Sequence, residues 1–315
     1  MQQKITVGIS SCLLGNHVRH DGGHKHHSFI TGTLGEYFDF VPFCPEVGAG
    51  LGTPRPPIRL VGDEQVVRVV GSKDPNLDVT DDLVGFCESK MPEIAHLGGF
   101  ILKKDSPSCG MERVKIYSEK GHPAHKGSGV FAKMILENYP NLPVEEEGRL
   151  GDARLRENFI ERIFIYQRWR ELMESGLSVS GLMDFHARHK LNFMSRHQDK
   201  VRELGRITAS ANSDNLEQAA SEYFDLAMKT LKKLATVKNH VNVLHHAMGY
   251  LKRELDGDDK QEMLETIESY RLMQVPLIVP ITLIKHHFRR SPHPYIENSW
   301  YFSPYPDELK LRNGV

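Results

Sequence analysis

The sequence predicts an α/β domain built on a mostly parallel sheet, followed by an all-α helical domain. In the first half of the 315 residues, short apolar runs alternate with loops rich in Gly and Pro. In the second half, apolar residues recur at steps of three and four, which is typical of amphipathic helices. Between the halves, residues 139–148 have the Pro- and Glu-rich composition of a linker. We therefore expect domains at 1–147 and 148–315.

Strands and a helix alternate in the first half. Three apolar runs have the length and composition of buried strands: Ile5–Ile9, Phe38–Phe43 and Phe100–Leu102. A helical pattern runs from Asp81 to Ala95, with Cys87 on its apolar face. Because strands that alternate with helices form parallel sheets covered on both faces, these runs predict a Rossmann-like sheet. Residues 66–70 and 114–116 are expected to add further or edge strands.

Helical periodicity covers most of the second half. The first pattern begins at Leu155 and ends at Gly176. Further helices are expected at four places: 180–204, 214–236, 238–254 and 258–272. Pro276 and Pro280 interrupt the last apolar stretch, which ends in a basic segment at 285–290.

Composition excludes several classes of protein. With 39% hydrophobic and 26% charged residues, the chain is neither disordered nor collagenous nor a coiled coil. No run approaches the roughly 18 apolar residues of a membrane helix, and the first residues lack the apolar core of a signal peptide. Four cysteines cannot form a disulfide scaffold in a chain of this length. We expect a cytoplasmic protein with reduced thiols and no membrane partner.

Three of the four cysteines follow the three predicted strands directly. They are Cys12, Cys44 and Cys109. If the strands are parallel, these thiols share the edge of the sheet at which open α/β folds bind ligands. Thiolates suit soft iron or zinc centres, so the pattern predicts a shared metal or cluster site without identifying the metal. For Cys87 we prefer the alternative, a buried small hydrophobic residue.

Two other patterns are weaker. The stretch Gly48–Gly52 resembles a phosphate-binding loop, but the Pro-rich residues after it open no helix. A Gly-rich loop carries a group of histidines that could bind a metal, although their spacing favours a solvated loop. These histidines are His17, His20, His24, His26 and His27.

The cysteine motifs resemble those of the thiouracil desulfidase (TudS) family. The matching stretches are Ser11–Gly15, Cys44–Glu46, Gly50–Arg55, Ser106–Gly110 and Gly127–Ala132. In the second half, residues 184–190, 242–250 and 301–306 resemble the all-helical domain often fused to that family. One departure is His20, where the family commonly has an aromatic phenol.

The resemblance implies a cofactor and a reaction. The cofactor would be a [4Fe–4S] cluster held by Cys12, Cys44 and Cys109, with one iron that has no protein ligand. The reaction would replace the C=S of a thiolated uracil by C=O without net redox change. The open iron could draw charge from the carbon–sulfur bond as a Lewis acid, and the attack of water would need a general base.

Two residues match the catalytic positions of the family. Glu46 matches the acid/base, and Ser106 matches a second position that could relay a proton or orient the intermediate. From the residues alone, Glu46 could instead pair with Arg55 or Arg59, and Ser106 could be a turn hydroxyl. Backbone N–H groups at 108–110, together with a nearby lysine, could also stabilise negative charge on sulfur or bind a phosphate.

The second half offers a surface for RNA. Basic residues are interleaved with aromatic residues and histidines at 168–170, 186–190 and 285–290, a mixture that suits phosphate contact and base stacking. The alternative places Trp169 and Phe288 in the core. Residues 1–148 carry 15 basic and 19 acidic side chains, and the remainder carries 25 and 22, which is weak evidence for an anionic partner.

The resemblance to the fused architecture implies a substrate larger than a free base. We therefore expect an enzyme that converts 4-thiouridine to uridine in tRNA, which would require distortion of the RNA around that base. One alternative is the same chemistry on free 2-thiouracil or on 4-thiouridine monophosphate. A second alternative is a non-catalytic RNA-binding iron–sulfur protein.

Overall fold

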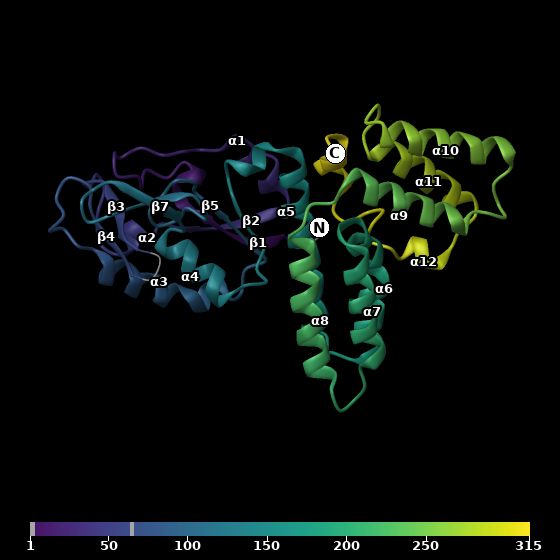
Figure 1. The fold of residues 1–315 in the computed structure, drawn as a ribbon, viewed down its shortest axis with the longest axis horizontal. Coiled ribbons are helices and arrows are strands. Elements are labelled where there is room, and N and C mark those ends of the chain that lie inside the picture. The colour runs from purple at the N-terminus through teal and green to yellow at the C-terminus, as the bar shows by residue number, and fades with distance from the viewer. Residues whose placement is uncertain (1–3, 64–65) are drawn as a thin grey trace. The chain divides into compact units, whose positions relative to one another are not determined.

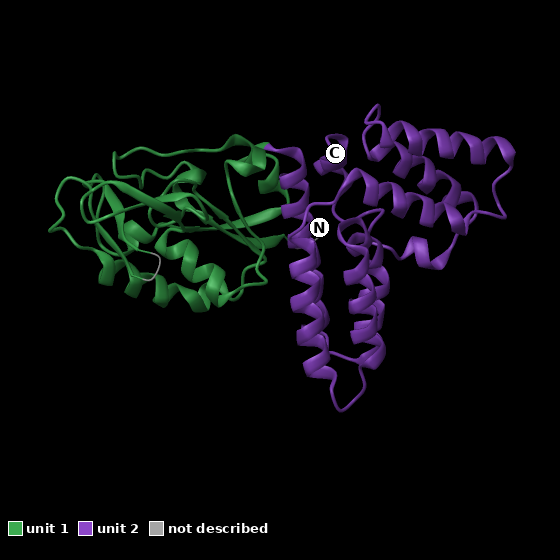
Figure 2. Cartoon of the chain, viewed as in Figure 1, with its two compact units in different colours: residues 1–151 green, residues 152–315 purple. Residues whose placement is uncertain are grey.

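The computed structural model describes residues 4–63 and 66–315, and the chain divides into two compact units. Unit 1 comprises residues 1–151 and unit 2 residues 152–315 (Figure 2). The division falls shortly after the boundary expected from the sequence. Within the described part of the chain, no helix combines the length and the apolar character that crossing a membrane would demand.

Unit 1 is an α/β domain. Its strands are β1 (Ile5–Ser10), β2 (Phe38–Phe43), β3 (Ile58–Gly62), β4 (Val67–Gly71), β5 (Gly99–Leu102), β6 (Val114–Tyr117), β7 (Pro123–Gly127) and β8 (Val144–Glu146). Its α-helices are α1 (Ser28–Thr31), α2 (Pro45–Gly48), α3 (Thr80–Ile94) and α4 (Val130–Asn138). Short 3-10 helices are η1 (Ser11–Leu14), η2 (Leu34–Glu36) and η3 (Arg149–Gly151).

The main sheet has the order β2-β1-β5-β8, and its neighbouring strands are parallel. The first three of these strands in the chain are the three predicted from apolar runs. Helices α3 and α4 pack against one another (Figure 1). In the core, the rings of Phe43, Phe100 and Phe131 lie 5.4–6.0 Å apart, centroid to centroid. The α/β class and its parallel sheet are therefore confirmed.

The additional strands do not extend the main sheet. They form a second sheet of order β4-β3-β6-β7, in which β3 pairs antiparallel with β4 and β6 antiparallel with β7. Only β3 and β6 are parallel within it. The additional strands expected at 66–70 and 114–116 are therefore present as β4 and β6, but they are not edge strands of the main sheet. The physical reason is that short connections allow consecutive strands to pair as hairpins, with no need to cross over to the main sheet.

The segment interpreted as a linker is partly a strand. Strand β8 pairs with β5 in the main sheet, and Glu145, Glu146 and Glu147 are all buried. Each carboxylate has a partner that offsets the cost of burial: Glu145 bonds the Arg149 guanidinium, Glu146 the backbone N–H of Met111, and Glu147 the Lys103 ammonium. In the sequence, three successive glutamates suggest a segment exposed to solvent. In the structure, hydrogen bonds and ion pairs with other parts of the chain compensate for the burial of their carboxylates.

Unit 2 is entirely helical. Its helices are α5 (Ala153–Glu174), α6 (Val179–Arg196), α7 (Gln198–Ser210), α8 (Leu216–Leu231), α9 (Val237–Tyr250), α10 (Gly257–Arg271), α11 (Ile278–Arg290), α12 (Pro294–Glu297), η4 (Asp307–Leu309) and η5 (Leu311–Asn313). The single helix expected at 180–204 is two helices, because His197 has extended backbone. Pro280 lies in the first turn of α11, where no intrahelical N–H is needed, so the helix continues through the basic segment.

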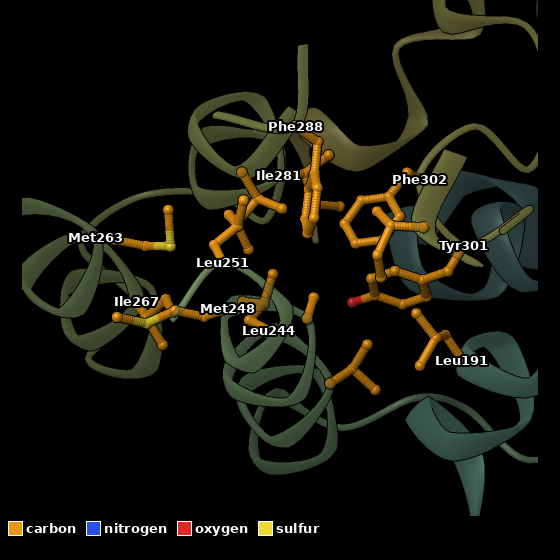
Figure 3. Packing of buried hydrophobic residues seen from close by; sticks show 14 of the residues in the cluster. Leu191, Leu244, Met248, Leu251, Met263, Ile267, Ile281, Phe288, Tyr301 and Phe302 are labelled. Carbon is orange, nitrogen blue, oxygen red and sulfur yellow. The ribbon is translucent and has the colours of Figure 1, made fainter. Parts of the chain in front are cut away.

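Hydrophobic clusters in two parts of unit 2 pack its helices together. One lies between α5, α6, α7 and α8 and includes Trp169. The other lies between α9, α10, α11 and the C-terminal segment and includes Phe288 and Tyr301 (Figure 3). Both aromatic residues whose role the sequence left open, Trp169 and Phe288, are therefore core residues. They cannot stack on bases of a nucleic acid in this conformation.

Candidate active site

Three thiols meet at the carboxyl edge of the main sheet. Cys12 lies in η1 directly after β1, Cys44 lies between β2 and α2, and Cys109 lies in the loop after β5. Since β1 pairs in parallel with both β2 and β5, these loops leave the sheet at the same edge. All three cysteines line one pocket of about 490 Å³. Cys87 is buried in α3 and does not line it.

Burial makes these thiols hard to ionise in the protein alone. It raises the pKa of Cys12 to about 11, although the nearby Lys103 ammonium opposes the shift. Burial also raises the pKa of Cys44, and it raises that of Cys109 well above the ordinary value despite a hydrogen bond with Ser10. Cys44 also raises the pKa of Cys12, and both Cys44 and Cys12 raise that of Cys109. A bound cationic centre would reverse this preference and release the protons.

The donor set fits an iron–sulfur cluster. Within residues 4–63 and 66–315, no three His, Cys, Asp or Glu side chains are grouped as ligands of a single metal ion. A zinc site needs its ligands around one ion, whereas a cubane cluster binds each thiolate to a different iron. Three thiols that line one pocket suit the second requirement, and Cys12, Cys44 and Cys109 are the residues that would hold the cluster.

Glu46 is a carboxylate of this pocket and is tightly engaged. It lies in the first turn of α2, two residues after Cys44. Its Oε2 accepts hydrogen bonds from Arg55 Nε (3.0 Å) and Nη2 (2.5 Å), and its Oε1 accepts one from Ser108 Oγ (3.0 Å). The two charged side chains are 14% and 4% exposed, so the pair is largely desolvated. Arg59 instead lies over the Tyr117 ring.

Arg55 ties three loops together around Glu46. Its guanidinium also donates to the carbonyl oxygens of Gly52 (2.8 Å) and Val18 (2.9 Å). Gly50 and Gly52 both have positive φ, a conformation that glycine adopts without strain. The glycine-rich stretch that resembled a phosphate loop is therefore the turn that brings Arg55 back to Glu46.

Ser106 lines the pocket and also shapes its own loop. Its Oγ accepts hydrogen bonds from the backbone N–H of Ser108 (3.2 Å) and of Cys109 (3.1 Å). The N–H of Gly110 donates to the Ser106 carbonyl (2.9 Å). The idea that the N–H groups at 108–110 bind a phosphate or stabilise sulfur is therefore wrong, because the loop itself uses them.

The rim of the pocket is rich in cations. Besides Arg55, four basic side chains line the pocket: Arg19, Lys25, Lys103 and Lys104. Lys103 Nζ is held 2.6 Å from Glu147 Oε1, and Asp105 adds a second nearby carboxylate. His20, the departure from the family pattern, lines the same pocket. The arrangement suits a ligand that carries negative charge near a soft, sulfur-containing group.

The structure adds supporting residues that the sequence did not reveal. Ser10 hydrogen-bonds the Cys109 sulfur, the Ser108 hydroxyl holds Glu46, and Glu147 anchors Lys103. Ser108 could have been suspected from its place inside a cysteine motif. Glu147 carried no signal, because it lies in what appeared to be a linker.

Comparison with known proteins finds a matching family model for each unit. Residues 7–147 match the family model described as 2-thiouracil desulfurase, and residues 190–306 match a model described as a protein of unknown function, DUF1722. The uncharacterized protein YbgA of Escherichia coli (strain K12) is 31% identical over 162 residues, which are 51% of this chain and 96% of YbgA. The chain belongs to the thiouracil desulfidase family, in a form that carries a helical C-terminal domain.

Membership of the thiouracil desulfidase family supports an enzyme with a desulfidase-type function. A solved structure described as the [4Fe–4S]-dependent thiouracil desulfidase TudS is 30% identical to this chain. It covers 47% of this chain and 94% of its own length, with a TM-score of 0.36. The cysteine pocket lies wholly within the residues that match the desulfurase model.

Proposed function

We propose that this protein is a [4Fe–4S]-dependent, non-redox desulfidase that converts 4-thiouridine to uridine in tRNA. The observation that carries the proposal is the pocket in which Cys12, Cys44 and Cys109 surround a space that also holds Glu46 and Ser106. In the reaction the oxygen of water replaces the sulfur of C=S, sulfide leaves, and no electrons are exchanged with a partner. When bound, a cluster with three thiolate ligands supplies one open iron that attracts a thiocarbonyl sulfur.

Glu46 is the group that accepts the proton of the attacking water. The Arg55 fork fixes one of its oxygens, which orients the carboxylate. The other oxygen is held by the Ser108 hydroxyl, a partner that can rotate away or pass on a proton. General base catalysis needs such a carboxylate within hydrogen-bond reach of the attacking water, and Glu46 lines the pocket.

Ser106 orients the reacting group. Because its oxygen already accepts two backbone N–H bonds, its own O–H is the part directed to other acceptors. A tetrahedral carbon formed by water attack on the uracil ring carries a new oxygen, and the Ser106 hydroxyl can donate to it. The loop that holds Ser106 also positions Cys109, so one short segment sets both the cluster ligand and this donor.

The cationic rim supports a nucleotide as the substrate. Arg19, Lys25 and Lys104 surround the pocket that a thiolated uracil would enter, and phosphate groups flank every base of an RNA. Unit 2 adds the excess of basic side chains noted in the sequence. These features favour a uracil that is part of a nucleic acid over a free base.

The decisive experiment uses protein reconstituted with iron and sulfide under strict exclusion of oxygen. Incubated with tRNA that contains 4-thiouridine, it should abolish the near-ultraviolet absorbance of that nucleoside and leave uridine in the digested RNA. The affinity for tRNA should fall steeply with salt, since phosphate contacts release counterions. Intact tRNA in the presence of a fully loaded cluster would refute the proposal.

A second candidate keeps the chemistry and changes the substrate. The pocket and its cationic rim belong entirely to unit 1, so a thiolated mononucleotide could be bound without unit 2. Parallel assays with 4-thiouridine monophosphate distinguish the two. Turnover of the monophosphate with untouched tRNA establishes this candidate, and binding of tRNA without any turnover points to a non-catalytic iron–sulfur protein.

A further inference from the structure

An ion pair of unit 1 presents its positive end to the cysteine pocket. Lys103 Nζ lies 2.6 Å from Glu147 Oε1, and the two side chains are 14% and 9% exposed. Lys103 lines the pocket together with Cys12, Cys44 and Cys109, whereas Glu147 is not among the described residues that line it. The pair therefore forms a dipole whose positive end is on the side of the three thiols.

Hydrogen bonds hold both ends of this pair in place. The Lys103 N–H donates to Ser10 Oγ (2.9 Å), and the Lys103 ammonium donates to the Lys104 carbonyl oxygen (3.0 Å). Glu147 Oε2 accepts from the Lys104 N–H (2.7 Å), and the Glu147 N–H donates to the Leu102 carbonyl oxygen (3.0 Å). Turning either charged group toward solvent would break one of these bonds as well as the ion pair. The orientation of the dipole is therefore built into the fold.

Lys103 acts on one of the three cysteines in particular. Its backbone is bonded to Ser10, two residues before Cys12, where the paired strands β1 and β5 end. Burial raises the pKa of Cys12, but among the charged groups Lys103 acts on it most strongly and lowers it, whereas Glu147 raises it more weakly. The carboxylate therefore cancels only part of the effect of the ammonium on this sulfur.

The other basic groups of the pocket differ from Lys103. Arg55 is paired with Glu46, and both line the pocket, so their charges largely compensate one another there. Three further cations on the rim are more exposed to water and salt, which screen their charges: Arg19, Lys25 and Lys104. Lys103 combines low exposure with a partner that lies behind it.

We propose that the Lys103–Glu147 pair sets the electrostatic potential of the cysteine pocket and stabilises the net negative charge of a cluster held by three thiolates; this inference rests on the cluster of the proposed function. A core with two positive charges and three thiolate ligands has one net negative charge, and uptake of one electron adds another. Sulfide that leaves a substrate in this pocket brings further negative charge, which the same ammonium stabilises. Lys103 acts on the cluster through space and is not one of its ligands.

The reduction potential of the reconstituted full-length protein measures this effect. Dithionite supplies one electron to the cluster, so positive charge nearby raises the potential and negative charge nearby lowers it. Lys103→Met should therefore shift the potential to more negative values, and Glu147→Gln should shift it to more positive values. Electron paramagnetic resonance of the reduced cluster follows the titration under strict exclusion of oxygen.

The opposite signs distinguish an electrostatic effect from a loss of structure. Both substitutions break the same ion pair, so damage to the fold alone would change both proteins in the same direction. Lys103→Arg keeps the charge and should keep the potential of the unchanged protein. Lys133→Met is the matched control and should show no shift, because Lys133 is an exposed lysine of α4 that pairs with Glu137 outside the pocket.

The outcomes separate clearly. Shifts in the same direction, an unchanged potential in both variants, or equal potentials in Lys103→Arg and Lys103→Met would each overturn the proposal. If Lys103→Met does not retain its cluster, the sign of the shift in Glu147→Gln decides. Because sulfur removal is not measured, a loaded protein without desulfidase activity contradicts the proposed function and leaves this inference intact. If the unchanged protein takes up no iron and sulfide, both are refuted.

Discussion

Replacing Glu46 by Gln separates catalysis from structure at the cysteine pocket. Glutamine keeps the shape of the side chain, and its amide oxygen can still accept from Arg55, while its NH2 would donate to the Ser108 hydroxyl. It cannot accept the proton of water. We expect kcat to fall about 10²- to 10⁴-fold, equivalent to about 3–5 kcal/mol in the activation barrier. Cluster content should be unchanged, since the three thiols are untouched.

The substitution should change the free energy of unfolding of unit 1 by less than it changes the activation barrier of the reaction. Glu46→Gln removes the charge from two hydrogen bonds with Arg55, in a pair that is 14% and 4% exposed. Arg55 still donates to the carbonyls of Gly52 and Val18, so it is not left isolated. The expected loss is about 1.5–3 kcal/mol, the range for hydrogen bonds to charged groups.

The assay measures loss of 4-thiouridine absorbance, iron and sulfide content, and urea unfolding followed by circular dichroism. Glu112→Gln is the matched control, because Glu112 is a half-exposed carboxylate of unit 1 that pairs with Arg149 (2.8 Å) outside the pocket. Turnover at the unmodified rate with a full cluster would remove Glu46 from the mechanism. Loss of the cluster would show instead that Glu46 is needed to build the site.

Three further predictions concern the ligands and the helical unit. Changing any one of Cys12, Cys44 and Cys109 to Ser should abolish the binding of iron and sulfide in anaerobic reconstitution. The control variant Cys87→Ala should bind both as the unchanged protein does. If one of the three Ser variants keeps its iron and sulfide, the cysteine replaced in it is not a cluster ligand. Arg196→Met should lower the free energy of unfolding by about 3–5 kcal/mol, because the buried Glu161 carboxylate (2.7 Å from Arg196) loses its charged partner and keeps only the hydrogen bond from Asn192. Urea unfolding followed by tryptophan fluorescence measures this loss, and a value below about 1 kcal/mol would contradict the argument. Burial lowers the pKa of both His189 and His240 in the folded protein. As the pH falls, the unfolded chain therefore binds protons at these histidines before the folded chain does. Unit 2 should lose stability below about pH 6.5, the ordinary pKa of histidine. The loss should be roughly 1.4 kcal/mol per pH unit for each histidine, and equal unfolding midpoints at pH 7.5 and 5.5 would refute the argument.

The sequence by itself determined the features that depend on neighbours along the chain. Apolar runs and periodicity located β1, β2, β5 and α3, as well as the helical character of unit 2. The position of each thiol directly after a strand was enough to place Cys12, Cys44 and Cys109 at one edge, because parallel strands end on the same side. Local patterns could do this because hydrogen bonding within helices and burial of strands follow from short-range spacing.

Tertiary structure alone decided which polar groups meet. The hydroxyl of Ser108 reaches Glu46 across 62 positions of the chain, and Lys103 reaches Glu147 across 44. The same long-range packing made part of a glutamate-rich segment a buried strand. Burial of a charged or polar group is tolerated only when a partner arrives from elsewhere in the chain, and spacing along the sequence does not encode that partner.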